Sequence, residues 1–140
     1  MWLRRVGVGF NQVRAMLGTR AVIGINGVGV KDYTLSSKTA SQITPNPTQH
    51  TTGAVYTQTG GATTLSFSRP LAHANVPITE SGNNLIVAHG SGNTFEYHES
   101  NRVALAVNMF SPSNSASQRT AATALAAVVA VLAFALSTSA

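Results

Sequence analysis

Apolar and polar residues alternate along much of the first 110 positions of the chain. This two-residue period is typical of β-strands that bury one face. The N-terminal run is the clearest, because Val6, Val8 and Phe10 are separated by glycines and share one face of an extended chain. Strands are predicted, with Gly, Asn and Pro turn signals between them, at 2–10, 19–25, 28–35, 53–58, 62–69, 85–89 and 102–110.

Short strands at this spacing predict an all-β domain. Turn signals such as Asn26-Gly27 and Gly60-Gly61 divide the runs, which is typical of a β-sandwich or barrel. Charged residues make up 9% of the chain, and this share suits strands and turns better than long charged helices. We therefore expect one immunoglobulin-like β-sandwich domain over residues 1–110.

The pattern changes after Phe110. Residues 111–120 are small and polar and are expected to form a linker, whereas residues 121–136 carry no charge. A spanning helix needs about 20 apolar residues. A glycolipid (GPI) attachment signal needs small residues, a polar spacer of roughly 8–12 residues and an apolar tail of roughly 10–20. We expect 121–136 to be a hydrophobic helical tail and part of such a signal, with Ser113-Asn114-Ser115 as the attachment triplet. A short transmembrane anchor and a soluble Ala-rich helix are the alternatives.

A lipid or transmembrane anchor would place the domain on the extracellular face of the plasma membrane, or outside another extracytoplasmic membrane. The first residues lack the apolar stretch of a signal peptide, so this expectation also implies an N-terminally incomplete sequence. The chain has no cysteine, which excludes disulfides and cysteine-ligated zinc or iron–sulfur sites. An exported domain with an adequate core can do without disulfides, so this absence does not settle the compartment.

The charge pattern argues against nucleic-acid binding, and the motifs argue against common catalytic sites. Nine Lys and Arg face four acids, a formal net charge of +5, but these cations are scattered instead of forming a basic patch. No paired carboxylates, Gly-x-Ser-x-Gly elbow or dinucleotide-binding glycine motif is present. The chain is therefore interpreted as a redox carrier or binding module more readily than as an enzyme.

Two residues in different loops could form a metal-ligand pair. His98 follows Tyr97 between two predicted strands, and Met16 lies in the loop after the first strand. A methionine thioether and a histidine imidazole together make an axial ligand pair for haem iron. A lone methionine more often fills a packing gap, so composition alone does not establish the pair. The other histidines are expected to be bystanders or wall residues: His50, His73 and His89.

Four segments, taken in order, resemble the DOMON family, which includes the cytochrome domain of cellobiose dehydrogenase. Residues 2–10 look like its W-[VI]-x-[IL]-G-[FI] strand, and residues 16–23 look like its M-x-G-[ST]-x-x-[VI]-I segment. Residues 67–71 are similar to its F-x-R-x-[LI] strand end. Residues 85–102 resemble its [LI]-[IW]-x-A-[YW]-G…[YH]-H…R block, although His89 replaces the usual aromatic residue.

The resemblance implies a b-type haem held by Met16 and His98. The haem would be bound non-covalently, since no Cys-x-x-Cys-His attachment site exists. Tyr97 would lie beside the haem, and Arg69 or Arg102 would pair with a propionate, with strand bracing as the alternative role for Arg69.

The implied function is one-electron transfer to a separate redox partner protein, on a membrane reached through the C-terminal tail. A module that binds sugar or another surface ligand without haem, and an inert gene fragment, are the alternatives. Family domains begin one or more strands earlier, so the resemblance also implies missing first strands and an exposed edge.

Overall fold

The computed structural model describes residues 5–13, 15–59, 61–72, 76–79, 83–96, 98, 101–107 and 127–135. Apart from one 3₁₀ turn, the regular elements of this part are strands, so the all-β class is confirmed. In chain order the elements are β1 (Arg5–Asn11), β2 (Thr19–Ile25), β3 (Gly29–Leu35), η1 (Ala40–Gln42), β4 (Thr52–Thr59), β5 (Ala62–Pro70), β6 (Asn83–Gly90), β7 (Arg102–Val107) and β8 (Ala127–Ala135).

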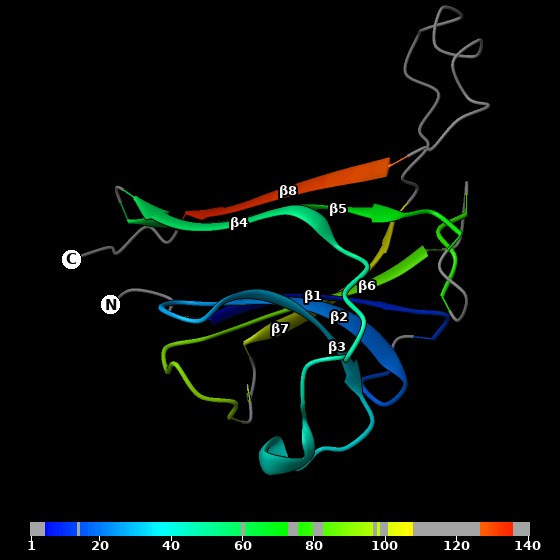
Figure 1. Ribbon diagram of the computed structural model, residues 1–140, viewed down its shortest axis with the longest axis horizontal. Helices are drawn as coiled ribbons and strands as arrows, with labels where there is room; N and C mark the ends of the chain where they lie inside the picture. The colour runs from blue at the N-terminus through cyan, green and yellow to red at the C-terminus, as the bar shows by residue number, and fades with distance from the viewer. Residues whose placement is uncertain are drawn as a thin grey trace, which may run out of the picture.

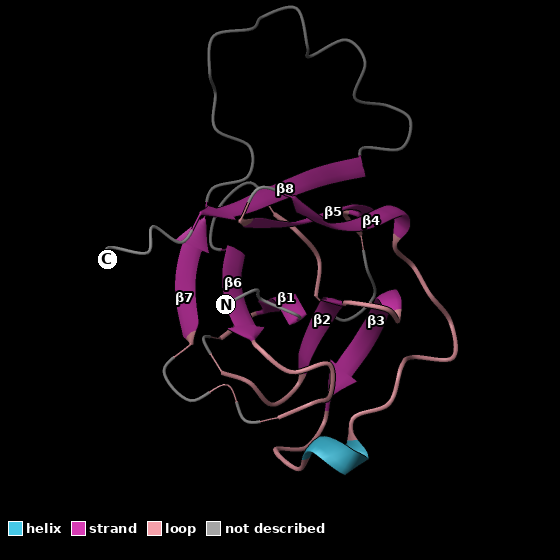
Figure 2. Cartoon of the chain, turned by 90° about the vertical axis from the view of Figure 1, so that its left-hand side faces the viewer, coloured by secondary structure: helices cyan, strands magenta, loops and turns pink. Residues whose placement is uncertain are grey.

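The strands form two layers, as in a β-sandwich. One sheet has five strands in the order β3-β2-β1-β6-β7, and the other has three in the order β4-β5-β8. Every neighbouring pair is antiparallel. Figure 1 shows the three-stranded sheet lying over one face of the five-stranded sheet, and Figure 2 shows the five strands side by side beneath it. The segment with η1 lies on the opposite face of the larger sheet (Figure 2).

The core lies between the two sheets. Val6, Val8 and Phe10 of β1 are 0%, 0% and 2% exposed, which confirms the face predicted from their alternation. They pack with Leu65 and Phe67 of β5, and the rings of Phe10 and Phe67 meet edge to face at 6.2 Å. Full burial of each such side chain contributes about 1.5–3 kcal/mol, so this layer accounts for much of the stability.

The inner face of β7 is less covered than that of β1. Val103 pairs with Val87 and Leu105 pairs with Leu85, so these residues share the inner face. Val103 and Leu105 are nevertheless 43% and 40% exposed, whereas Val87 is 2% exposed. Within the described part of the chain, the smaller sheet therefore shields the centre of the larger sheet better than its β7 edge.

Part of the apolar C-terminal run pairs with the smaller sheet. Ala127–Ala135 forms the nine-residue strand β8, which pairs with β5 in a register that sets Leu132 opposite Leu65. A run that is rich in β-branched valine can add to an open strand edge, where it satisfies unpaired backbone groups. The linker 111–120 and residues 121–126 and 136 of the expected tail lie outside the described residues. Among the residues that are described, no helix is long and apolar enough to cross a membrane.

Candidate functional site

A cavity of about 310 Å³ lies on the face of the five-stranded sheet that points away from the core. Strands β1, β2, β6 and β7 supply its floor, and the loops after β1, β3 and β6 supply its walls. Five of the lining residues on these strands carry no side chain larger than a methyl group: Gly7, Gly9, Ala21, Ala88 and Ala104. The pairing of Gly7 with Ala88, and of Gly9 with Ala21, places these small residues side by side. The two glycines leave the centre of β1 without side chains on this face, and Ile23 and Ile86 lie beside it on the neighbouring strands.

The glycines of the floor are required by close packing. A Cβ atom at Gly9 would collide with Cγ2 of Thr19 and would lie 3.5 Å from the carbonyl oxygen of Ile86. A Cβ atom at Gly7 would lie 3.2 Å from Cγ1 of Ile23. These contacts explain why β1 alternates apolar residues with glycine instead of with polar residues. One face of this strand packs in the core, and the other has no side chain at positions 7 and 9.

The loop that carries Met16 is held by hydrogen bonds from its two ends. Asn11, at the end of β1, donates through Nδ2 to the carbonyl oxygens of Ala15 (2.7 Å) and Leu17 (3.3 Å). Thr19, at the start of β2, donates through Oγ1 to the same Ala15 oxygen at 2.7 Å. Its backbone N–H also donates to the carbonyl of Met16 at 3.1 Å. Met16 is half-buried in the cavity wall, on a loop with a defined shape.

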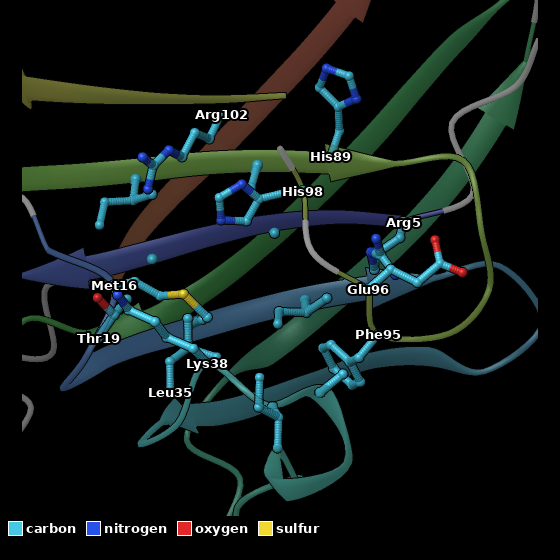
Figure 3. Close-up of a pocket in the computed structure, with 18 of the residues that line it drawn as sticks. Arg5, Met16, Thr19, Leu35, Lys38, His89, Phe95, Glu96, His98 and Arg102 are labelled. Atoms are coloured by element: carbon cyan, nitrogen blue, oxygen red, sulfur yellow. The ribbon is translucent and has the colours of Figure 1, made fainter. Parts of the chain in front are cut away.

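His98 reaches the same cavity from the loop between β6 and β7. The backbone N–H of Asn101 donates to the His98 carbonyl at 2.8 Å, and its carbonyl accepts from the N–H of His89 at 3.0 Å. This turn attaches the loop to the end of β6. His98 is half-buried, and Figure 3 shows that it and Met16 project into the same space from different loops. The structure thus brings together the two residues that the sequence suggested as a ligand pair.

His89 has a different orientation. Its backbone borders the cavity, but it pairs with Val6 and so shares the inner face of the sheet. In Figure 3 its ring points away from Met16 and His98. Partial burial lowers the pKa of His89, which favours the neutral imidazole. Its predicted role as a wall residue therefore suits its position better than a role as an iron ligand. Tyr97 and His73 lie outside the described residues.

The two arginines suggested as propionate partners lie in different places. Arg102 opens β7 opposite Ala88 and lines the cavity, where it is exposed. Arg69 lies between the sheets, where its Nη2 donates to the carbonyl of Val76 at 3.0 Å. Burial lowers the pKa of Arg69 to about 10. The structure does not bring Arg69 to the cavity, and it supports the bracing role instead.

Arg5 was missed by the sequence analysis, which counted it among scattered cations. It lines the cavity and is 7% exposed, and its Nη1 has no hydrogen-bond partner among the described residues. Burial lowers the pKa of Arg5, and the negative charge of Glu96 partly opposes this effect. The spacing in the sequence could have indicated this position. Arg5 precedes Gly7 and Gly9 by two and four residues, so its side chain lies on the same face of the strand.

The cavity combines apolar walls with an excess of positive charge. Its cationic side chains are Arg5, Lys38 and Arg102, and its carboxylate is Glu96. The larger apolar side chains that line it are Ile23, Leu35, Ile43, Ile86 and Phe95. Few neutral polar groups are present, and the hydroxyl of Thr19 is already bonded to Ala15 and Asn11. The arrangement suits a flat apolar ligand that carries acidic groups.

These residues fit a b-type haem. The apolar lining would suit the porphyrin ring, and the unpaired Arg5 Nη1 could receive a carboxylate. Met16 and His98 supply the thioether and imidazole that a six-coordinate iron needs. Among the described residues, no group of three or more His, Cys, Asp or Glu side chains could hold a metal ion by itself. A Met/His pair on a porphyrin does not require such a group.

No family model matches the chain, and no curated protein or solved structure matches it either. The interpretation of the cavity therefore depends on its own residues and on the sequence motifs given above.

Proposed function

We propose that this domain is a DOMON-type, b-type haem-binding module that transfers single electrons, with Met16 and His98 as the axial ligands. The observation that carries the proposal is that both residues line one cavity with largely apolar walls. The positions of these two residues were suggested by sequence motifs alone. The apolar side chains around this cavity support a porphyrin as the proposed ligand.

The ligand pair determines the kind of chemistry. Met16 and His98 would hold the haem, and iron ligated by this pair would supply one-electron chemistry at a raised reduction potential. The hydrogen bonds from Asn11 and Thr19 restrict the loop that presents Met16. Ile23, Leu35 and Phe95 make this lining apolar. Because the chain has no cysteine, retention of the haem depends on these contacts.

The cavity supports haem over the alternative of a sugar-binding module. Oriented polar groups usually determine how a polar ligand binds. Among the described residues that line this cavity, the neutral hydrogen-bonding side chains besides the imidazoles of His89 and His98 are limited to Thr19, and Phe95 is the one Phe, Tyr or Trp. Both features favour an apolar ligand with charged substituents. Electron transfer from such a site needs a second protein, so the proposal includes a separate redox partner.

Membrane attachment through the C-terminal tail is a further part of the proposal. The apolar residues 121–136 would enter a membrane, or would be removed when a lipid anchor replaces them, at an extracytoplasmic membrane face. Residues 127–135 are also the strand that pairs with β5. The same residues cannot form β8 and lie in a membrane at once, so the two uses are alternatives.

Absorption spectra test the haem assignment. The full chain is reconstituted with haem and measured before and after reduction with dithionite. Sharp reduced α and β bands are expected from a six-coordinate iron, and both Met16→Leu and His98→Ala should abolish them. Met16→Leu conserves volume and removes the sulfur, so it separates ligation from packing. His50→Ala is the control, because this exposed histidine does not line the cavity.

One outcome would overturn the assignment. A folded protein with no Soret band after reconstitution would exclude haem, and a ligand-binding module would then be the better interpretation. If the bands persisted in both ligand variants, the cavity could still hold haem, but Met16 and His98 would not be its ligands.

A further inference from the structure

The position of Arg5 points to a specific role in ligand binding. Arg5 begins β1 and pairs with Gly90 at the end of β6. Its guanidinium group lies against this glycine, so that a Cβ atom at position 90 would contact Nη2 and would lie 2.8 Å from Cζ. Any other residue at position 90 would therefore displace the guanidinium. The absence of a side chain at Gly90 makes room for Arg5 at the edge of the cavity.

The guanidinium group is incompletely paired. Arg5 is 7% exposed, and its Nη1 has lost contact with water without gaining a hydrogen bond from the described residues. An unsatisfied buried donor costs about 1–3 kcal/mol, and a charged donor costs more. Such groups are rare in native proteins, and a functional role is one of the reasons for which they are retained. The other cations of the cavity, Lys38 and Arg102, are exposed and carry no comparable cost.

Glu96 is the described acid whose charge acts on Arg5. Figure 3 shows the two side chains next to each other at one end of the cavity. Glu96 is itself exposed, and its Oε1 accepts a hydrogen bond from Thr94 Oγ1 at 3.2 Å. Because Glu96 is a solvated carboxylate on a loop, a carboxylate of a ligand can replace it beside Arg5.

We propose that Arg5 is the carboxylate anchor of this cavity, and that a carboxylate of the ligand takes the place of Glu96 beside its guanidinium group. A planar guanidinium group binds a carboxylate with two parallel hydrogen bonds. The inference rests on the proposed function for the identity of the ligand, since a haem propionate would be this carboxylate. It goes further because it assigns the anchor to Arg5, and because Glu96 competes with the ligand carboxylate for the guanidinium group.

Iron-free protoporphyrin IX tests the inference without using the axial ligands. Its binding to the full chain is measured by porphyrin fluorescence, beside the binding of its dimethyl ester in the same dilute detergent. The ester has the same ring but no carboxylate. We expect the acid to bind at least about tenfold more tightly than the ester, which corresponds to about 1.4 kcal/mol. Equal affinities for acid and ester would overturn the inference.

Substitutions assign the effect to the proposed pair. Arg5→Met should weaken binding of the acid by about tenfold or more and should leave binding of the ester unchanged. Glu96→Gln should tighten binding of the acid, because the competing charge is removed. Lys31→Met is the matched control, since it removes one positive charge from an exposed position that does not line the cavity. An equal loss in Lys31→Met would mean that only the net charge matters, and would contradict the inference.

The two proposals can fail separately. If Arg5→Met does not fold, the comparison of acid and ester on the unsubstituted protein and the Glu96→Gln variant still decide the matter. Carboxylate-dependent porphyrin binding, together with a haem spectrum that is insensitive to Met16 and His98, would support the anchor and overturn the ligand assignment. A Met/His spectrum with equal binding of acid and ester would support the ligand assignment and overturn the anchor.

Discussion

The guanidinium carbon of Arg69 lies 4.1 Å from the centre of the Phe10 ring, so a cation from one sheet packs on an aromatic residue from the other. The same arginine donates to the carbonyl of Val76 at 3.0 Å. A desolvated cation–π contact contributes about 2 kcal/mol, and the aliphatic stem of arginine adds packing. Arg69 thus connects β5 to β1 and to the segment after β5. This contact gives the arginine a structural role far from the cavity.

Replacement of Arg69 should affect stability and not the ligand. Arg69→Ala is expected to lower the free energy of unfolding by about 2–4 kcal/mol, because it leaves a void and loses both contacts. Arg69→Met should cost less, since it fills the space and removes a buried charge whose Nε has no hydrogen-bond partner among the described residues. Urea unfolding measures both variants. A change in haem affinity of the folded protein would show instead that Arg69 contributes to the cavity.

The close approach of Gly9 and Thr19 gives a second prediction. Gly9→Ala should destabilise the protein by about 1–3 kcal/mol, because the new methyl group would collide with Cγ2 of Thr19. Thr19→Ser removes this methyl group and keeps the hydroxyl that donates to Ala15. The double variant should therefore recover part of the loss, a coupling that a double-mutant cycle measures. Strict additivity of the two changes would show that the collision is relieved elsewhere.

Partial burial of His89 predicts a pH dependence of stability. Because burial lowers its pKa in the folded state, the unfolded chain takes up a proton more readily than the folded protein. The stability contributed by neutral His89 is present above the unfolded pKa of about 6.5, and is lost as the pH falls through the lower folded pKa. His89→Gln should flatten the decline of melting temperature below about pH 6.5. An unchanged slope in this variant would assign the decline to other groups.

Removal of residues 121–140 tests the contribution of β8. Strand β5 would lose its partner on one side, and its exposed backbone groups could then pair with other chains. We expect a lower melting temperature and more self-association, measured by thermal unfolding and by light scattering. Porphyrin binding should change little, because the cavity lies on the other sheet. An unchanged melting temperature would mean that the tail contributes nothing to the sandwich, which would favour its use as an anchor.

Local patterns predicted the strands well. The expected segment 19–25 coincides with β2, and the predicted runs elsewhere in 2–110 correspond to β1 and β3–β7 with small shifts at their ends. The reason is that alternation and turn residues act over a few positions, and a strand with one buried face shows them directly. The tail was the exception. An apolar run without alternation fits a helix or a buried strand equally well, and the pairing partner decides between them.

The sequence by itself determined the approximate positions of β1–β7, which face of β1 is apolar, and that Met16 and His98 lie in loops. Only the tertiary structure decided that β1 lies between β2 and β6, which brings those two loops to one cavity. It also separated Arg69 from that cavity and placed Arg5 in it. Strand order and the covering of a face depend on contacts between distant segments, and these contacts leave no periodic signal in the sequence of either segment.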